Sequence, residues 1–381
     1  MIPIITLNNA VIMMWIHEYS AWPGFTWDTK TLASKLADIR HRQGRLLGQM
    51  ESLGFESRKE ASLKTLTNDV VKSSAIEGEA LNPEEVRSSI ARRLGLDLGG
   101  LISSGRHVEG IVEMMLDATQ QFSSPLTKSR LFDWHAALFP TGRSGIKHIT
   151  VADWRTDNNE PMQVVSGPIG KEKVHFEAPK ADRLEKEISI FLEWFNKNQE
   201  VDPVLKAGIA HFWFVTIHPF EDGNGRIARA IGDMALAQAD GAQDRFYSLS
   251  TQIEAERKDY YKRLEEQQKA SPEITHWLDW FLDCLGRALS HAEKALSNVM
   301  FKVQLWNKIN QNQLNARQMH IINRMLEDNF EGHMNTSKYA KMAKCSNDTA
   351  LRDIQELKER QIFIQNPGGG RSTSYRINDN L

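Results

Sequence analysis

The sequence predicts a mainly α-helical protein, with one small β-hairpin and a short pair of strands near its end. Apolar residues recur at helical spacing in the long segments, for example across 204–217. Runs that favour β-structure are few, the clearest lying within 162–176 and 362–377. Of the 381 residues, 41% are hydrophobic and 25% charged, an ordinary globular balance in a chain long enough for more than one domain.

Charge and cysteine content exclude several classes of protein. The formal net charge of −2 argues against a protein that coats nucleic acid or membranes. Its two cysteines, Cys284 and Cys345, support neither a disulfide scaffold nor a cysteine metal site, which favours a reducing cytoplasm. No apolar run is long enough for a transmembrane helix, and the N-terminus lacks the pattern of a signal peptide. We therefore expect a cytoplasmic protein with no membrane partner.

The first region, residues 1–98, is expected to form a helical module. Asn82-Pro83-Glu84-Glu85 opens one of its helices with a cap, a first-turn proline and acidic residues that suit the helix dipole. Met13 and Met14 directly precede Trp15, so residues 1–12 are expected to be an over-extended start. The tryptophans of the region are interpreted as packing anchors, namely Trp15, Trp22 and Trp27.

A helix is expected over about 63–78, and it carries a carboxylate on its apolar stripe. The stripe consists of Leu66, Val70, Ser73 and Glu77. A buried carboxylate is costly unless a cation or several donors meet it, so one interpretation gives Glu77 a partner elsewhere in the fold. In the other interpretation Glu77 is exposed at a fraying helix end before Gly78. The residues alone leave both open.

The most informative segment is the loop His218-Pro219-Phe220-Glu221-Asp222-Gly223-Asn224-Gly225-Arg226. The apolar run before it forms a helix that Pro219 ends, so His218 lies at a helix end facing the loop. After Gly223 and Gly225 a second helix begins, and its free backbone N–H groups suit a phosphate.

Three further side chains of this loop suit nucleotide chemistry. Asp222 is a hard oxygen ligand for a magnesium ion that carries nucleotide phosphates, and Asn224 can donate to a phosphoryl oxygen. Arg226 and Arg229, three residues apart, share a face of the second helix. A plainer interpretation is a glycine-rich turn between core helices with His218 as a capping group. The ordered series of base, acid, glycines, amide and cations favours the functional one.

The segment resembles the core motif of the Fic (filamentation induced by cAMP) family, HPFx(D/E)GNGRxxR, at every position from His218 to Arg229. The resemblance implies transfer of AMP from ATP to a hydroxyl-bearing side chain of a protein, with release of pyrophosphate. It makes His218 the general base, Asp222 the Mg²⁺ ligand and Phe220 a packing residue. The phosphate contacts that it implies come from Gly223, Asn224 and Gly225 as an anion hole, from Arg226, and from Arg229 at the γ-phosphate. The Doc toxins, which phosphorylate their targets, carry Lys where Gly225 stands, so Gly225 favours adenylyl transfer.

The segment Ser73-Ser74-Ala75-Ile76-Glu77-Gly78 is similar to the Fic inhibitory motif (S/T)xxxE(G/N). In relatives with this motif before the core, the glutamate pairs with the second motif arginine, here Arg229, and prevents productive seating of the γ-phosphate. The resemblance therefore implies an enzyme held inactive by Glu77, with Ser73 in the same motif. In some relatives this glutamate orients water to remove AMP from a modified protein, so de-AMPylation stays an alternative.

Two β-favouring runs around a Gly-Pro turn, between Pro161 and Pro179, predict a small hairpin. By resemblance it is the family's flap, whose exposed edge aligns a segment of the target protein by strand addition next to the α-phosphate. The residues expected to do so are Val164, Val165, Ser166 and Gly167. A surface hairpin with no such role is the alternative.

Tyr260, Tyr261 and Gln268 stand where relatives place tyrosines and an amide around adenine. Ring stacking and one amide contact would suffice to hold a base. Gln268 departs from the more usual Asn, which leaves adenine selectivity open. Without the resemblance, the tyrosine pair is more typical of a core or an interface.

Residues 314–381 predict three helices, at 316–328, 335–344 and 348–360, followed by two short strands around a glycine-rich tip. This order resembles a winged helix-turn-helix. As a DNA-binding module it would place the third helix in a major groove and Arg371 at a phosphate. Many such modules contact proteins instead, and acidic residues of the third helix repel phosphate. These are Asp348, Asp353, Glu356 and Glu359.

The sequence is thus interpreted as mainly α, with an N-terminal helical module (1–98), a helical Fic core with a hairpin flap (109–287), a connecting helix (288–313) and a winged helix-turn-helix (314–381). The expected activity is autoinhibited adenylylation of protein hydroxyls, with ATP as substrate, Mg²⁺ as cofactor, and an unidentified protein or the chain itself as acceptor. Two rivals stay open. One is transfer of another nucleotide or phosphate-containing moiety by the same site, and the other is a transcription regulator whose core only senses nucleotide.

Overall fold

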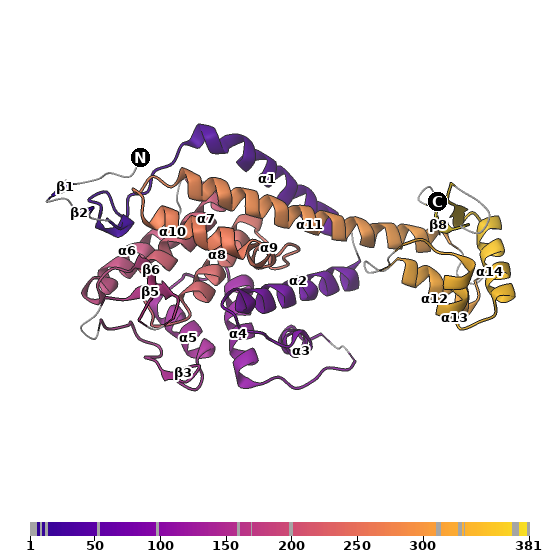
Figure 1. The fold of residues 1–381 in the computed structure, drawn as a ribbon, viewed down its shortest axis with the longest axis horizontal. Coiled ribbons are helices and arrows are strands. Elements are labelled where there is room, and N and C mark those ends of the chain that lie inside the picture. The colour runs from indigo at the N-terminus through magenta and orange to yellow at the C-terminus, as the bar shows by residue number, and fades with distance from the viewer. Residues whose placement is uncertain are drawn as a thin grey trace. The chain divides into compact units, whose positions relative to one another are not determined.

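The computed structural model describes the chain apart from residues 1–5, 8–9, 12–13, 52–53, 97–98, 158–160, 169, 198–200, 310–313, 327–329, 331, 368–372 and 379–381. It divides into two compact units, Met1–Ala292 and Glu293–Leu381, which are described separately (Figure 1). The mainly α-helical class predicted from the sequence is confirmed. Across the described part of the chain, no helix combines the length and the apolar character needed to cross a membrane.

A helical module opens the first unit. Its elements are β1 (Thr6–Leu7), β2 (Ala10–Val11), a 3-10 turn η1 (Ile16–Glu18), α1 (Thr29–Glu51), α2 (Phe55–Ile76) and α3 (Pro83–Arg93). α3 begins as the sequence predicts, since the Asn82 side chain accepts from the backbone N–H of Glu84 at 3.0 Å and Pro83 fills the first turn. α2 begins before the helix expected at 63–78, and it ends at Ile76 with Glu77 as its C-cap and Gly78 at φ +84°.

The core of the first unit is built around α7 and α8. Its helices are α4 (Arg106–Gln120), α5 (Lys128–Leu138), α6 (Leu184–Asn196), α7 (Pro203–Ile217), α8 (Asn224–Asp240), α9 (Leu249–Ala255), α10 (Arg257–Gln268) and the part of α11 (Thr275–Lys308) up to Ala292, with a 3-10 turn η2 (Ala181–Arg183). α7 is buried on almost every side, because its neighbours enclose it. Gly208 allows α11 to approach α7 closely, since a Cβ at this position would lie 3.0 Å from the Phe281 ring of α11.

The boundary expected between residues 287 and 288 falls inside a helix. α11 is continuous from Thr275 to Lys308, because this segment contains no proline and its one glycine, Gly286, is accommodated within the helix. The connecting helix expected at 288–313 is therefore the second part of α11 and not a separate element.

The predicted hairpin is present in the first unit. Its strands, β5 (Gln163–Ser166) and β6 (Lys173–Glu177), pair antiparallel with a bulge between Val164 and Val165. Trp15 anchors the base of the hairpin by meeting Phe176 edge-on, with 5.5 Å between ring centroids. Two shorter strands, β3 (Arg143–Ser144) and β4 (Lys147–His148), form another antiparallel pair.

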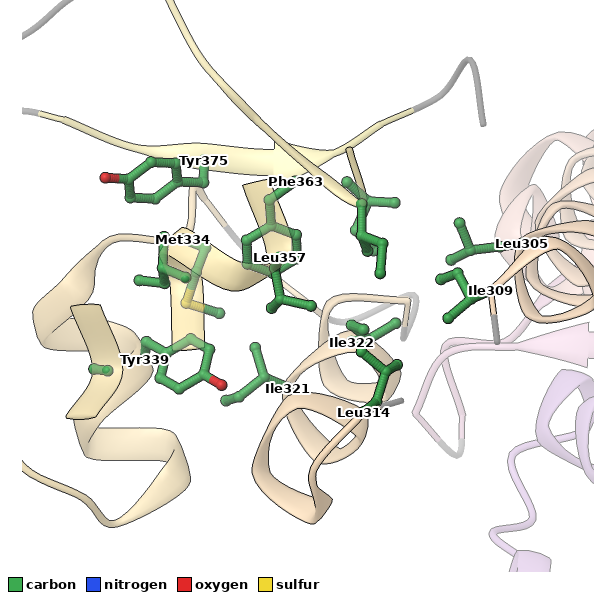
Figure 2. Packing of buried hydrophobic residues seen from close by; sticks show 14 of the residues in the cluster. Leu305, Ile309, Leu314, Ile321, Ile322, Met334, Tyr339, Leu357, Phe363 and Tyr375 are labelled. Carbon is green, nitrogen blue, oxygen red and sulfur yellow. The ribbon is translucent and has the colours of Figure 1, made fainter. Parts of the chain in front are cut away.

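The second unit contains the elements expected of its sequence. They are α12 (Ala316–Met325), α13 (Thr336–Ala343), α14 (Asn347–Glu359), and the antiparallel strands β7 (Phe363–Gln365) and β8 (Tyr375–Ile377). Figure 2 shows side chains from all three helices and both strands converging on one apolar core, with Leu357 and Phe363 near its middle. Arg371, expected at a DNA phosphate, lies outside the described residues.

One of the acidic residues on α14, Asp353, faces the interior of the second unit. Asp353 is 4% exposed and accepts hydrogen bonds from Nε of Arg317 at 2.9 Å and from the Tyr339 hydroxyl at 3.1 Å. Glu356 accepts from Nε2 of Gln318 at 2.8 Å. The Asp353 carboxylate thus serves packing between helices, which leaves Asp348, Glu356 and Glu359 as the exposed acids of α14 among those noted in the sequence.

We predict that Asp353→Ala loosens the second unit. The substitution leaves the buried Tyr339 hydroxyl and the Arg317 guanidinium without their acceptor, which costs about 2 kcal/mol. Hydrogen exchange measured by mass spectrometry on the full chain should show faster exchange in peptides from 316–377 only. The exposed Glu359→Ala is the control and should change protection by less than about 0.5 kcal/mol. Equal protection in Asp353→Ala and the wild type would contradict the assignment.

Candidate functional site

The loop between α7 and α8 is shaped by two left-handed residues. His218 ends α7 at φ +52°, and Gly223 precedes α8 at φ +84°. At Gly223 a Cβ would also lie 2.9 Å from the Phe139 ring, so the position requires glycine. The Asn224 side chain closes the loop, because it accepts from the Phe220 N–H at 2.9 Å and donates to the Phe220 carbonyl at 2.8 Å. Any contribution of Asn224 to an anion hole would therefore come mainly from its backbone N–H.

His218 is held in a form that can accept a proton. Its side chain is half-buried, and its Nδ1 lies 3.2 Å from the Val215 carbonyl, which leaves Nε2 as the acceptor when Nδ1 carries the hydrogen. Burial lowers the pKa of His218 to about 4, and the nearby positive charge of Arg155 acts in the same direction. The imidazole is therefore neutral at pH 7, which is the state required of a general base.

Arg155 fixes the backbone of His218 by a hydrogen bond to its carbonyl, and no motif in the sequence pointed to this residue. The side chain is 2% exposed. Its Nε donates to the His218 carbonyl at 2.8 Å, its Nη1 to Asp157 at 2.6 Å, and its Nη2 to the Pro179 carbonyl. Arg155 therefore connects the loop to the segment that follows β6. It lies 63 residues before His218, outside any recognisable motif.

His135 of α5 supports the same loop from the other side. Its ring stacks on Phe220, with 4.1 Å between centroids and 7° between planes. Its Nε2 lies 3.2 Å from the Asp222 carbonyl, and its Nδ1 accepts from the Ala152 N–H at 3.2 Å. Burial lowers the pKa of His135 to about 4, so it is neutral and holds both contacts. No motif or spacing in the sequence pointed to this role.

Asp222 provides one carboxylate at the mouth of the loop. Its Oδ1 accepts from the Gly223 N–H at 2.6 Å, and its Oδ2 accepts from the Ser144 hydroxyl. Within the described residues no cluster of three or more His, Cys, Asp or Glu side chains could hold a metal by itself. Mg²⁺ commonly takes one or two carboxylates and completes its shell with phosphate oxygens and water. A single carboxylate beside an anion site therefore fits Mg²⁺ that arrives with a nucleotide.

Glu77 reaches the site from the end of α2. Its Oε1 lies 2.7 Å from Nη2 of Arg229, and its Oε2 accepts from the Tyr261 hydroxyl at 3.2 Å. Ser73 also binds Arg229. The Ser73 hydroxyl accepts a hydrogen bond from Nε of Arg229, and the Ser73 carbonyl accepts one from Nη2, both at 2.9 Å. A Cβ on Gly225 would lie 2.3 Å from Oε1 of Glu77, so the carboxylate rests directly on the loop. The ion pair between Glu77 and Arg229 implied by the resemblance is present.

The Arg226 guanidinium has one nitrogen in an ion pair and another without a hydrogen-bond partner among the described residues. Its Nη1 donates to Oε2 of Glu79 at 3.0 Å, and its guanidinium carbon lies 5.1 Å from the centroid of the Phe139 ring. The residue is 5% exposed, yet its Nε has no hydrogen-bond partner among the residues that the structure describes. A buried and unpaired guanidinium N–H beside a glycine loop suits an anionic ligand.

The residues expected around adenine do not share one environment. Tyr260 is 1% exposed, its hydroxyl lies 2.9 Å from Nε2 of His211, and its ring packs against Trp280 at 5.7 Å. The Tyr260 ring is therefore part of the core in this structure, and its contact with a base stays a prediction. Tyr261 is 39% exposed and can offer its ring. Gln268 is 5% exposed and lies with its Nε2 3.3 Å from the Thr216 hydroxyl.

Two family models match the chain. Residues 125–236 match the model described as the Fic/DOC family, and residues 15–96 match a domain of unknown function, DUF4172. A helical core that presents a glycine loop at a helix start, together with the first match, defines the class of domain. The chain carries a Fic/DOC family domain over residues 125–236.

Individual relatives are similar over shorter or weaker stretches. The protein adenylyltransferase Fic of Nematostella vectensis is 40% identical over 63 residues, which cover 16% of this chain and 15% of that protein. The protein adenylyltransferase Fic of Culex quinquefasciatus is 24% identical over 253 residues, covering 65% of this chain and 45% of that protein. The chain thus spans less than half the length of these curated relatives. A solved Fic family protein from Desulfovibrio desulfuricans G20 is 20% identical, with a TM-score of 0.49 over 90% of this chain and 95% of that one.

We predict that the first unit loses stability as the pH falls below about 6.5. His135, His211 and His218 have pKa values lowered by burial to about 4, 3 and 4. In the unfolded chain each returns to about 6.5, so between these values the unfolded state binds protons that the native state does not. Stability is full above pH 6.5 and falls toward pH 4, by up to about 1.4 kcal/mol per pH unit for each histidine.

Urea unfolding of the full chain, followed by tryptophan fluorescence between pH 5 and 7.5, measures this slope. His211→Gln should reduce the dependence of the free energy of unfolding on pH by up to about 1.4 kcal/mol per pH unit, because glutamine keeps a partner for Tyr260 without titrating. The exposed His41→Gln is the control and should leave the slope unchanged. A pH-independent free energy of unfolding across this range would refute the assignment of three neutral histidines.

Proposed function

We propose that this protein is a Fic-type adenylyltransferase that transfers AMP from ATP to a hydroxyl side chain of a target protein. The observation that carries the proposal is the buried Nε of Arg226, unpaired among the described residues, on the first turn of α8, in the same segment as a neutral His218. Backbone N–H groups at a helix start and a buried guanidinium suit the phosphates of a nucleotide. The Fic/DOC match over 125–236 and the names of the curated relatives support the same activity.

In this proposal each group on the loop has one task. The target hydroxyl oxygen forms a bond to the α-phosphorus of ATP, the bond from that phosphorus to the bridging oxygen breaks, and pyrophosphate leaves. Nε2 of His218 takes the hydroxyl proton. The backbone N–H groups of Gly223, Asn224 and Gly225 and the side chain of Arg226 hold the phosphates. Asp222 would hold Mg²⁺, which neutralises phosphate charge when it is bound.

Gly225 favours adenylyl transfer over phosphoryl transfer. The Doc toxins, relatives that phosphorylate their targets, carry Lys at this position. Here a Cβ at Gly225 would already lie within 2.3 Å of the Glu77 carboxylate, so a side chain could not be added without moving Glu77. A glycine loop that leaves room for the β- and γ-phosphates suits ATP bound with its α-phosphate toward His218.

Glu77 is proposed to keep the enzyme in a low-activity state. The γ-phosphate needs Arg229, and Glu77 already occupies Nη2 of this arginine together with the Ser73 carbonyl. A carboxylate at that point also repels a triphosphate. The Tyr261 hydroxyl holds the other oxygen of Glu77, so the inhibitory contact is supported from α10 as well.

The hairpin is proposed to align the target segment. The outer edge of β5 has no partner strand in the described part of the chain, and its Val164 and Val165 side chains are 36% and 47% exposed. An extended peptide can add to such an edge through main-chain hydrogen bonds. The hairpin is fixed relative to α10, because Nδ1 of His175 lies 2.6 Å from Oε2 of Glu265.

We predict that Glu77→Gly raises AMP incorporation. Loss of the carboxylate frees Arg229 for the γ-phosphate, and we expect a gain of at least about tenfold, equivalent to roughly 1.4 kcal/mol. His218→Ala should lower the activity of the Glu77→Gly protein by about 100-fold or more, because it removes the base. The measurement is incorporation of label from α-labelled ATP with Mg²⁺ into protein, and Glu84→Gln on exposed α3 is the control. If Glu77→Gly is no more active than the wild type, the inhibitory role is wrong.

We further predict that ATP is the preferred donor. The Glu77→Gly protein would be incubated with ATP, GTP, CTP or UTP plus Mg²⁺, and products would be identified by intact mass and peptide sequencing. The expected outcome is a mass gain of one adenylate, on the chain itself or on an added target. A gain of phosphate or another nucleotide would favour the rival transfer, whereas loss of AMP from a pre-modified protein by the wild type would favour de-AMPylation.

A further inference from the structure

The end of α2 carries a second carboxylate that contacts the site. Glu79 lies two residues after Glu77, on the far side of Gly78 at φ +84°. Its Oε2 accepts from Nη1 of Arg226 at 3.0 Å, and its Oε1 contacts Nε2 of His107 on α4. The hydrogen bond with His107 lowers the pKa of Glu79 although partial burial opposes this, so Glu79 is a carboxylate at neutral pH.

The two carboxylates hold their arginines differently. Glu77 and Ser73 together occupy Nε and Nη2 of Arg229, whose Nη1 is buried without a hydrogen-bond partner in the described part of the chain. Glu79 takes only Nη1 of Arg226, whose Nε stays buried without a partner among the described residues. The contact from Glu79 therefore fixes the direction of the guanidinium without using the N–H that a phosphate needs.

Packing around Arg226 makes this orientation specific. The guanidinium lies over the Phe139 ring at 5.1 Å, which restricts it to one plane. Glu79 then sets its rotation within that plane through Nη1. His107 in turn restrains Glu79, because it engages the oxygen that Arg226 does not use. The order of support thus runs from α4 through His107 and Glu79 to Arg226.

We propose that Glu79, restrained by His107, is a positioning residue that orients Arg226 toward the phosphates of the nucleotide. This inference rests on the proposed function. It gives the two carboxylates at the end of α2 opposite effects. Glu77 weakens productive nucleotide binding by occupying Arg229, whereas Glu79 strengthens binding by preparing Arg226, much as supporting groups orient the direct ligands of a metal.

The test is a double-mutant cycle on nucleotide affinity. Binding of MgATP is measured by isothermal titration calorimetry in a Glu77→Gly/His218→Ala background, where the inhibitory Glu77 is absent and turnover is minimal. Glu79→Gln should raise the Kd about fivefold or more, within the range of couplings between residues in contact. Arg226→Ala should weaken binding further, and adding Glu79→Gln to it should have little additional effect, because Glu79 acts only through Arg226.

Conservative and control variants separate positioning from a general effect on folding. His107→Ala should reproduce the effect of Glu79→Gln, while His107→Gln, which keeps an N–H donor, should restore most of the affinity. Glu84→Gln, on the exposed first turn of α3, should change nothing. In the active Glu77→Gly protein, Glu79→Gln should raise the KM for ATP with kcat nearly unchanged, a split that a folding defect would not produce.

The outcomes distinguish this inference from the function on which it rests. Unchanged ATP binding by Glu79→Gln would overturn the positioning role. Tighter binding would overturn it too, because Glu79 would then be a second inhibitory residue. Additive effects of Glu79→Gln and Arg226→Ala would overturn it as well. If the background protein bound no MgATP at all, the proposed function would fail and this inference with it.

Discussion

Two arginines on the first turns of α8 are almost wholly removed from water, and the organisation of the site depends on how they are neutralised. Arg226 is 5% exposed and Arg229 is 2% exposed. A guanidinium in such surroundings is stable only if a carboxylate and further hydrogen bonds meet it. Both carboxylates come from one place, the end of α2, as Glu77 and Glu79. The N-terminal helical module therefore belongs to the site, because moving α2 away would leave two buried charges unpaired.

A second buried cluster of charged residues holds α2 at a point nearer its N-terminus, at Asp69. Arg245 is fully buried and pairs with Asp233 of α8, while the Ser248 hydroxyl donates to Asp69 of α2. Burial and the charge of Asp233 raise the pKa of Asp69 to about 7. Asp69 precedes Glu77 by eight residues, roughly 12 Å along a helix. α2 is thus tied to the α8 region at two separated points, which restricts both its position and its rotation.

The sequence could predict the parts of the site that depend on local order. The loop from His218 to Gly225, the hairpin, and the cap of α3 follow from spacing, glycine placement and capping chemistry, each readable within about ten residues. Arg155, His135 and Glu79 could not be found in this way. They act across separations of 63, 87 and 147 residues on groups that only the fold brings near. The burial of Tyr260 could not be predicted for the same reason, since a tyrosine that lines a pocket and one that fills a core have the same local sequence.

The exposed hairpin carries a risk as well as a use. A strand edge with apolar side chains and no partner can pair with any extended chain, including a second copy of the same hairpin. The bulge between Val164 and Val165 interrupts a regular ladder, and the strand is only four residues long, from Gln163 to Ser166. Both features restrict self-association to short and irregular pairings. Lengthening β5 or removing its bulge would therefore favour aggregation, and this limits how long and regular an exposed edge the hairpin can present.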